Sequence, residues 1–373
     1  MKAYLIFVNA TNSNNNKFYN MELLGNIISV EYGRVGSTST KLNYPGYKWK
    51  SLYNSKLKKG YTDITELKTG VEIIVKESNN KDFNQFYDTF SKYTTNHVKH
   101  NYNVEKASKK QIQEAQILIN NLSTISDINI FNSTLIDLFK IIPRKMSDVK
   151  RHLLTDINNK DKLIIREQDN IDSIDSINTV ITENPFIDLN IDFIEVVTPD
   201  NISKLFNQGN NSRYKIYKCY KVNHKNNVDK FNNWLNNQKN KETEYLIHGT
   251  RNPNVFSILK SGLLIRPSNA YYSGSAYGDG IYHSSHTSKS LNYTGSDNDK
   301  IFFIQNVHMG KPYVYDGWYR DGKGISKNEM NYKGVQSLNC DSLYVKPGDG
   351  LLNSEYIVYN SEQTVCEYIL WIK

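Results

Sequence analysis

The sequence has 373 residues, which is enough for two or three domains, and 38% of them are hydrophobic, which is enough to build globular cores. The formal net charge of +8 favours polyanionic partners, nucleic acid ahead of an anionic membrane surface, although many proteins of this charge bind neither. No apolar run approaches the ~20 residues that span a bilayer, which argues against a membrane protein. The three cysteines include no CxxC pair, which excludes a zinc ribbon or a thioredoxin motif and suits a reducing compartment.

Residues 1–98 predict a small α/β unit. The apolar run at 3–8 is too short for a signal peptide, so we expect a first β-strand there and another at 27–32. The glycines of Gly33-Arg34-Val35-Gly36 indicate a strand end or a turn. Basic and aromatic residues then interleave from residue 44 to 61. They suit contacts with phosphates and bases, or an amphipathic helix with a solvated lysine face.

Residues 99–184 change to a helical period. Ser108 and Gln111 form a capping-box pattern at the start of a first helix. Apolar residues recur at helical spacing after it, and a second helix should end at Pro143. A third helix is expected over residues 150–180. Nothing in this segment suggests chemistry, so we interpret it as packing.

From residue 185 onward β character returns. Strands are expected at 214–222 and 245–249. Asn252 and Pro253 predict the N-cap and first position of a helix that Gly262 ends. Two β-rich runs, 355–359 and 364–372, are joined by a polar turn and predict an antiparallel hairpin.

The simple catalytic patterns are missing from the sequence. There is no Walker loop and no serine-hydrolase elbow, and the glycine-rich stretch 274–280 precedes a β-like run instead of the helix that a Rossmann site needs. His283 and His286 lack a third ligand, so no metal site is expected. Glu355 is unusual because strands are depleted of glutamate, and its carboxylate lies on an exposed face or serves a function.

Five ordered stretches together resemble the transferase domain of the poly(ADP-ribose) polymerases, across residues 185–373. They are Leu246–Arg251, Ile258–Leu263, Tyr277–Tyr282, Ser288–Tyr293 and Ser354–Tyr359. The resemblance implies an α+β, multidomain fold. It consists of a small antiparallel-sheet WGR-like domain over residues 1–98, a shortened helical regulatory domain over 99–184 and an ADP-ribosyltransferase domain with a split β-sheet over 185–373.

The resemblance implies that NAD⁺ is the substrate and that no metal takes part. In the family's pattern His248 bonds the adenosine ribose, and Asn254 lies on the adenosine side. The Gly249 backbone and the Ser290 hydroxyl hold the nicotinamide carboxamide. Two tyrosines enclose the nicotinamide ring, with Tyr293 stacked on it and Tyr282 as the opposite wall. The catalytic residues it implies are His248, Tyr282 and Glu355.

Glu355 also bears on the product. In the family a glutamate here accompanies chain elongation, and Lys289 matches a position near the acceptor. We therefore expect a polymer built on protein acceptors, the chain itself among them. The alternatives are transfer of single ADP-ribose units and a catalytically silent scaffold that binds DNA ends.

The stretch from Tyr32 to Gly36, with Gly60 and Tyr61 downstream, resembles the WGR domain of the DNA-dependent members, with Tyr32 in place of the signature tryptophan. This implies that Tyr32 packs on sugar at a DNA strand break and that Arg34 contacts the DNA or the next domain. The alternative is a domain that only docks on the catalytic part.

The helical segment resembles a shortened version of the family's regulatory domain, so we expect appreciable basal activity without DNA. We further expect a monomer without a membrane partner. The family implies the nucleus in a eukaryote, and the cytoplasm is expected otherwise.

Overall fold

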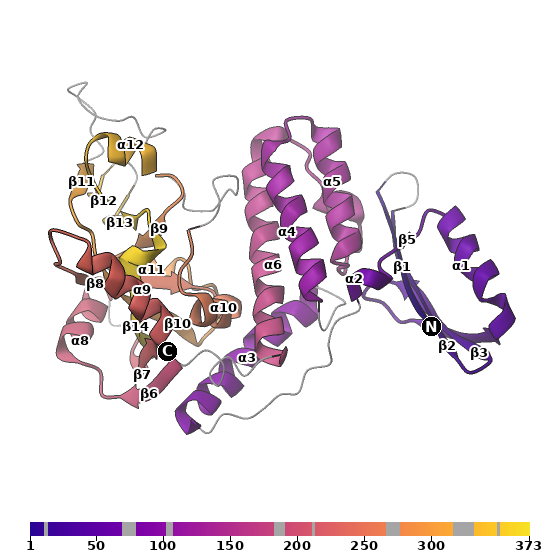
Figure 1. Ribbon diagram of the computed structural model, residues 1–373, viewed down its shortest axis with the longest axis horizontal. Helices are drawn as coiled ribbons and strands as arrows, with labels where there is room; N and C mark the ends of the chain where they lie inside the picture. The colour runs from indigo at the N-terminus through magenta and orange to yellow at the C-terminus, as the bar shows by residue number, and fades with distance from the viewer. Residues whose placement is uncertain are drawn as a thin grey trace. The chain divides into compact units, whose positions relative to one another are not determined.

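The computed structural model shows two compact units (Figure 1). The first unit comprises Met1–Ile73 and Thr94–Asn178, and the second comprises Ile74–Tyr93, Thr179–Ser268 and Gly274–Lys373. The structure describes residues 1–10, 14–68, 80–101, 107–182, 191–210, 213–265, 277–315, 332–348 and 351–373. The start of the glycine-rich stretch 274–280 lies outside these residues. Among the described helices, none is long and apolar enough to cross a membrane.

A five-stranded antiparallel sheet with the order β4-β3-β2-β1-β5 forms the start of the first unit. The strands predicted at 3–8 and 27–32 are confirmed, whereas β2 was missed because its first residues belong to an Asn-rich stretch. Tyr19 and Met21 of β2 are buried on the same face as Ile28 and Val30 of β3. The strands are β1 Lys2–Asn9, β2 Asn15–Leu24, β3 Ile27–Arg34, β4 Thr40–Pro45 and β5 Thr62–Asp63.

One helix covers this apolar face. After the turn η1 (Gly46–Lys48), α1 (Trp49–Lys58) packs Trp49, Leu52 and Tyr53 on the sheet, while Lys50 and Lys58 are exposed. The interleaved basic and aromatic residues therefore form an amphipathic helix, in which the period of the apolar side chains matches one helical face.

The helices α4, α5 and α6 lie side by side (Figure 1). The predicted capping box is confirmed, since the Gln111 N–H donates to Ser108 Oγ and the Ser108 N–H donates to Gln111 Oε1, both at 3.0 Å. The second helix ends just before Pro143, as expected. The third begins later than predicted, because Asp148 and Asp156 first cap two short 3₁₀ turns. The elements are α2 Thr65–Lys68, α4 Lys109–Thr124, α5 Ile128–Ile141, η2 Val149–His152, η3 Ile157–Asn159 and α6 Lys160–Thr182.

The second unit contains two sheets, with the strand orders β6-β7-β14-β10-β8 and β11-β12-β13-β9. This is the α+β, split-sheet architecture expected of residues 185–373. The first sheet consists of β6 Ile191–Val196, β7 Ile216–His224, β8 Glu244–Thr250, β10 Lys300–Val307 and β14 Thr364–Ile372. The second consists of β9 Ile281–His283, β11 Pro312–Tyr315, β12 Ser342–Val345 and β13 Glu355–Val358.

The hairpin predicted for the last two strands is wrong. β13 pairs with β12 and β9, whereas β14 pairs with β10 and β7. The turn η6 (Ser361–Gln363) carries the chain from one sheet to the other. The side-chain oxygen of Gln363 accepts the N–H groups of Tyr359 and Asn360, and its Nε2 donates to the His308 carbonyl. These contacts satisfy the turn without any pairing between the two strands.

Short helices cover the sheets of the second unit. Gly262 ends α10 with a φ of +73°, as predicted. Asn252 is not the N-cap, however, because it opens a 3₁₀ turn and its amide donates to the Asp299 carbonyl at 2.8 Å. The helices are α8 Asp200–Asn207, α9 Lys225–Asn236, η4 Asn252–Asn254, α10 Val255–Ser261, α11 Thr287–Leu291 and α12 Tyr332–Ser337.

Helix α3 (Lys81–Asn101) was not anticipated. The domain boundary expected between residues 98 and 99 falls inside it, and its residues up to Tyr93 are counted with the second unit. Phe83, Phe86 and Phe90 are buried in the core of that unit, among strands β6, β7, β10 and β14.

Candidate active site

Several of the residues expected at the NAD⁺ site lie where the two sheets of the second unit meet. Ile247 of β8 and Ser284 after β9 exchange backbone hydrogen bonds of 2.8 and 2.9 Å. The next residue along β8 is His248, whose Nδ1 lies 3.0 Å from the Tyr282 carbonyl oxygen. A carbonyl only accepts, so Nδ1 carries the proton and Nε2 is left as an acceptor.

Two histidine rings pack together behind this contact. The rings of His248 and His283 meet edge to face with centroids 6.2 Å apart. Burial lowers the pKa of His248, and burial together with the neighbouring His248 lowers the pKa of His283 to about 3. Both imidazoles are therefore neutral near pH 7.

Gly249 is required by the close approach of β8 and α11. A Cβ atom at this position would lie 2.1 Å from the backbone oxygen of Ser290, far inside van der Waals contact. Ser290 is 2% exposed, and its backbone lies directly against Gly249 with no side chain between them. Only glycine allows this approach. The arrangement suits a planar carboxamide, which needs a donor and an acceptor close together.

Tyr282 is held rigidly. Its hydroxyl donates to the Gly278 carbonyl at 2.8 Å and accepts the Tyr277 N–H at 3.0 Å. Burial raises the pKa of Tyr282, so the phenol stays protonated. Tyr293, by contrast, is 40% exposed, so part of its side chain reaches the surface. Burial first and the charge of Glu355 second raise the pKa of Tyr293.

Glu355 opens β13 and is 4% exposed. Its Oε1 lies 2.5 Å from Nζ of Lys289, which α11 contributes. The nearby carboxylate also raises the pKa of Tyr282, though less than burial does. The structure thus brings Lys289, Glu355 and both tyrosines together. A buried carboxylate needs such a partner, because a lone buried charge costs several kcal/mol. The sequence did not reveal this ion pair.

Asn254 ends the turn η4 that follows β8. Its N–H donates to the Arg251 carbonyl at 3.0 Å, and its own carbonyl accepts the Ser257 hydroxyl at 2.9 Å. These contacts fix the backbone at the residue that the family resemblance assigns to the adenosine side of NAD⁺.

The two histidines that were considered as metal ligands are engaged separately. His283 Nε2 lies 3.2 Å from Thr364 Oγ1, and His286 Nδ1 lies 3.1 Å from Ser285 Oγ. Within the part of the chain that the structure describes, no group of three or more His, Cys, Asp or Glu side chains could hold a metal ion.

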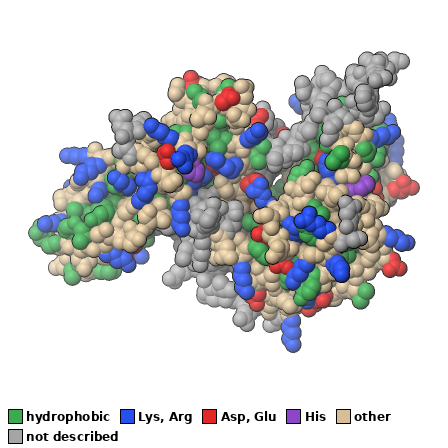
Figure 2. Space-filling view, turned by 180° about the vertical axis from the view of Figure 1, so that it is seen from behind, with side chains coloured by type: hydrophobic (Ala, Val, Ile, Leu, Met, Phe, Trp, Pro, Cys, Tyr) green, Lys and Arg blue, Asp and Glu red, His purple; other side chains and the backbone are tan. Residues whose placement is uncertain are grey.

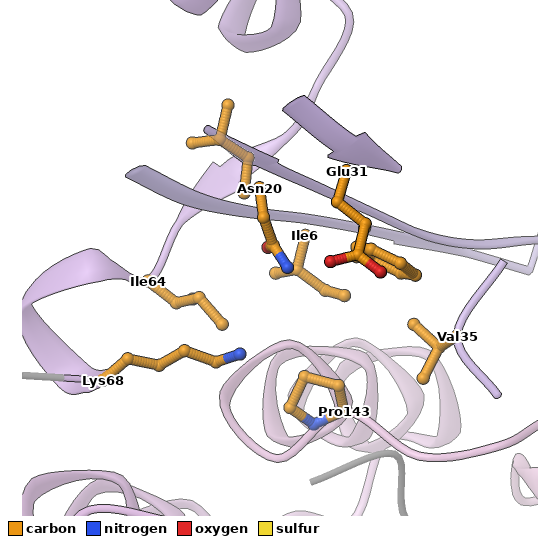
Figure 3. Close-up of a pocket in the computed structure, with 9 residues that line it drawn as sticks. Ile6, Asn20, Glu31, Val35, Ile64, Lys68 and Pro143 are labelled. Atoms are coloured by element: carbon orange, nitrogen blue, oxygen red, sulfur yellow. The ribbon is translucent and has the colours of Figure 1, made fainter. Parts of the chain in front are cut away.

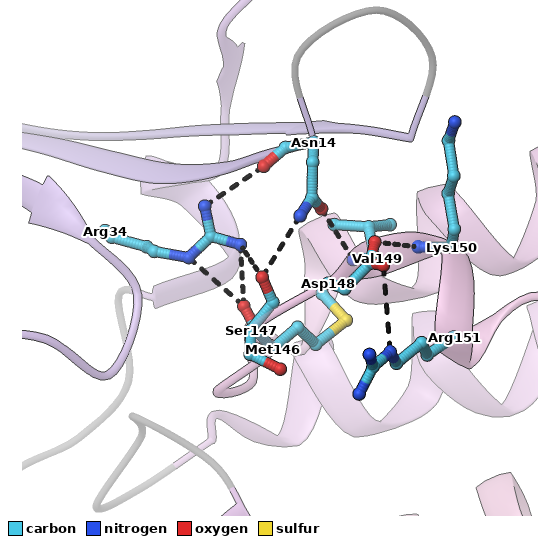
Figure 4. A network of polar contacts seen from close by, with 8 residues as sticks. All are labelled: Asn14, Arg34, Met146, Ser147, Asp148, Val149, Lys150 and Arg151. Carbon is cyan, nitrogen blue, oxygen red and sulfur yellow. Dashed lines mark hydrogen bonds and ion pairs between the residues drawn. The ribbon is translucent and has the colours of Figure 1, made fainter.

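Arg34 is anchored inside the first unit (Figure 4). Its Nη2 donates to the carbonyls of Met146 and Ser147, both at 2.8 Å, and its Nη1 donates to the Asn14 carbonyl at 3.0 Å. The guanidinium thus links β3 to the segment between α5 and η2. Tyr32, two residues earlier, packs on Tyr19 at 5.8 Å.

Two asparagines join the same link, and the sequence did not single them out for it. Asn14 Nδ2 donates to the Ser147 carbonyl at 3.1 Å, and its Oδ1 accepts the Val149 N–H at 2.7 Å. Asn16 Nδ2 donates to the Arg144 carbonyl at 2.9 Å. The φ of +44° at Asn14 is a conformation that asparagine tolerates better than most residues. The Asn-rich composition of the chain hid this signal.

A cavity of about 190 Å³ lies in the first unit between the sheet and the end of α5 (Figure 3). Asn20, Glu31 and Lys68 point into it, and Pro143 lies on its wall. The Ser39 hydroxyl donates to Glu31 at 2.6 Å, and burial lowers the pKa of Lys68. None of the site residues expected from the sequence lines this cavity.

Two family models match the chain. The poly(ADP-ribose) polymerase catalytic domain matches residues 200–373, and the WGR domain matches residues 1–68. The second match agrees with the small N-terminal sheet, and the first with the two sheets that carry the site.

Curated relatives agree with these matches. The chain is 45% identical over 174 residues to a putative poly [ADP-ribose] polymerase-like protein, 100L, of Invertebrate iridescent virus 6. The aligned region covers 46% of this chain and 90% of that protein. It is 33% identical over 151 residues to poly [ADP-ribose] polymerase 2 of Arabidopsis thaliana, covering 34% of this chain and 23% of that one. Poly [ADP-ribose] polymerase 2 of Homo sapiens is 28% identical over 151 residues, or 34% and 26% of the two chains.

Proposed function

The chain belongs to the poly(ADP-ribose) polymerase family and is an NAD⁺ ADP-ribosyltransferase, and we propose that it builds ADP-ribose chains on protein acceptors, itself included, in response to DNA breaks. The observation that carries the polymer proposal is the buried pair of Lys289 and Glu355 beside two tyrosines. Transfer of single units is the alternative.

NAD⁺ supplies the glycosidic bond to nicotinamide, whose loss leaves positive charge on the ribose. The backbone of Gly249 and the hydroxyl of Ser290 hold the carboxamide, in the contact where no Cβ fits. The exposed ring of Tyr293 stacks on the nicotinamide, and Tyr282 closes the other side. His248, with its proton turned to the Tyr282 carbonyl, offers Nε2 to a hydroxyl of the adenosine ribose.

Glu355 performs the central electrostatic step. Its carboxylate stabilises the positive charge that develops on the ribose, a contribution that is often the largest in catalysis. The same carboxylate can bond the hydroxyl of an earlier ADP-ribose unit and orient it for attack. The ion pair with Lys289 keeps the Glu355 carboxylate in position. A glutamate that accepts a hydrogen bond from the attacking hydroxyl favours elongation. Polymer is therefore the expected product.

DNA contact is assigned to the first unit. Figure 2, in which that unit lies at the left, shows many Lys and Arg side chains on its surface. Exposed Lys50, Lys58 and Lys59 of the α1 region can meet phosphates. Lys56 lies over the rings of Tyr19 and Tyr32, at 3.9 and 5.9 Å. We assign the DNA contact to Tyr32 and these lysines, and the link to the helical segment to Arg34.

The test is to incubate the protein with labelled NAD⁺, with and without nicked 5′-phosphorylated DNA, and to separate the products on denaturing gels. Wild type should give a polymer ladder that DNA strengthens and that is already detectable without DNA. Glu355→Gln should retain only short adducts. The matched control is Glu362→Gln, in the turn η6, which should behave as wild type.

Each proposal has its own contradicting result. If wild type gave only single ADP-ribose adducts, the polymer proposal would be wrong and transfer of single units would take its place. The absence of product without DNA would contradict the expected basal activity of the short helical segment, and an unchanged rate with DNA would contradict stimulation by breaks. No label in any protein would indicate a silent scaffold.

A further inference from the structure

Helix α3 contributes buried rings to the core of the second unit, although neither family match includes it. Phe86 is fully buried, and its ring meets Phe256 edge to face at 6.1 Å. Phe90 contacts Trp371 of β14 in the same way at 5.2 Å. Phe256 belongs to α10, which directly follows η4. The helix therefore supports the segment that carries Asn254.

Polar contacts fix both ends of this contact surface. Before the helix, Asn80 Nδ2 donates to the Phe193 carbonyl of β6 at 2.5 Å. Tyr93 is the last residue of α3 that belongs to the second unit. Its hydroxyl donates to Asp299 Oδ2 at 2.6 Å. Tyr93 thereby reaches the segment that leads into β10.

Asp299 connects α3 to the turn η4. Its Oδ1 accepts the Trp371 indole N–H at 2.8 Å, and its backbone carbonyl accepts Asn252 Nδ2 at 2.8 Å. Burial opposes ionisation of Asp299, but the hydrogen bonds from Tyr93 and Trp371 and the charge of Lys373 outweigh it and hold its pKa below the usual range. Asp299 is therefore an oriented anion.

Asn252 connects Asp299 to the turn η4. It is fully buried, opens η4 and also donates to Asp297 Oδ2 at 3.1 Å. The turn ends at Asn254. A buried amide whose N–H groups are held on two sides leaves the turn little freedom to shift.

We propose that Tyr93 is a positioning residue of the transferase: its hydroxyl anchors the side chain of Asp299 and so fixes this residue, the backbone carbonyl of Asp299 holds Asn252, and Asn252 sets the turn on which the adenosine of NAD⁺ rests. This rests on the proposed placement of the adenosine beside Asn254. Tyr93 touches neither NAD⁺ nor the reacting atoms. Loss of its hydroxyl should therefore weaken the binding of the adenosine and leave the chemical step at Glu355 unchanged. Such a change raises KM and leaves kcat unaltered.

Tyr93→Phe tests the proposal, because it removes the hydroxyl and keeps the ring. The matched control is Tyr217→Phe, since Tyr217 is half exposed and its ring also contacts Trp371, at 4.8 Å. The full chains are compared by KM and kcat for NAD⁺ and by inhibition with nicotinamide, well below the Tm of each variant. In Tyr93→Phe the KM should rise about fivefold to tenfold, the effect of one hydrogen bond, while kcat and nicotinamide inhibition stay at wild-type values.

Equal KM values for Tyr93→Phe and wild type would overturn the proposal. A parallel loss of nicotinamide affinity would overturn it too, because the whole cleft would then have loosened. Both results require an active wild type and leave the proposed function standing. A wild type that neither binds nor turns over NAD⁺ would contradict the proposed function and this inference with it.

Discussion

At the scale of single residues, Gly249 gives the strictest constraint on the site. A Cβ there would lie 2.1 Å from the Ser290 backbone oxygen, so Gly249→Ala must push β8 and α11 apart. A misplacement of about 1 Å can cost about 100-fold in rate, and we expect a loss of that order in NAD⁺ turnover. Initial rates measure it, and thermal unfolding separates a local shift from global unfolding. Near-normal turnover would mean that the two elements do not hold the nicotinamide.

The buried His283 predicts a pH dependence of stability. Its folded-state pKa of about 3 lies below the ordinary value of 6.5, so the unfolded chain binds a proton that the folded chain does not. Stability is therefore lost as the pH falls from about 6.5 towards 3. At about pH 5 the loss is about 2 kcal/mol.

His283→Phe should remove this part of the acid sensitivity. Urea unfolding of both proteins at about pH 7.5 and about pH 5 measures it, and each protein serves as its own reference at the higher pH. Wild type should lose about 2 kcal/mol more than the variant over this interval. Equal losses in the two proteins would show that His283 is protonated in the folded state.

The sequence predicted individual site residues but not the partners that the structure gives them. His248, Tyr282 and Glu355 stand in short stretches whose order along the chain is informative. The ion pair of Lys289 with Glu355 joins α11 to β13, and which charges pair across a fold depends on how the two sheets close. The same holds for Arg34, whose partners at Met146 and Ser147 come from a distant segment.

At the scale of elements, α3 carries the clearest energetic consequence. Phe86 is fully buried among Phe193, Tyr220 and Phe256, so Phe86→Ala leaves a cavity in the core of the second unit. The expected loss of unfolding free energy is about 3–5 kcal/mol. Denaturant unfolding measures it, with Tyr47→Ala as a control at an 82% exposed aromatic that should cost little. A loss no larger than that of the control would mean that α3 does not pack on this core.

The same scale shows what a local pattern can and cannot predict. The capping box at Ser108 and the stop at Gly262 were predicted, because each depends on a few neighbouring residues. The hairpin of β13 and β14 was not predicted correctly, because both runs are β-rich and their actual partners, β12 and β9 for β13 and β10 and β7 for β14, come from distant segments. β2 was missed because strand pairing outweighs the low strand propensity of its asparagines.

At the scale of the whole molecule, the link between the N-terminal sheet and the helical segment predicts how DNA would act. Arg34→Ala removes hydrogen bonds to the carbonyls of residues 14, 146 and 147. We expect the unfolding free energy of the first unit to fall by about 1–3 kcal/mol and the stimulation by DNA to weaken, while activity without DNA persists.

A nearby arginine provides the control for this prediction. Arg151 is largely exposed, and its Nε lies 3.8 Å from Asp148 Oδ2, so Arg151→Ala should leave both stability and stimulation near wild type. Unfolding curves and DNA titrations are recorded for both variants. If Arg34→Ala loses DNA affinity at unchanged stability, Arg34 contacts DNA directly.

The most direct test of the central claim is to measure released nicotinamide and protein-bound ADP-ribose in the same reaction with NAD⁺. Transfer by the site around Glu355 predicts that the two amounts rise together, with more than one ADP-ribose unit per modified position, and that Glu355→Gln lowers the number of units per position. Nicotinamide release with only free ADP-ribose, or no release at all, would contradict the account.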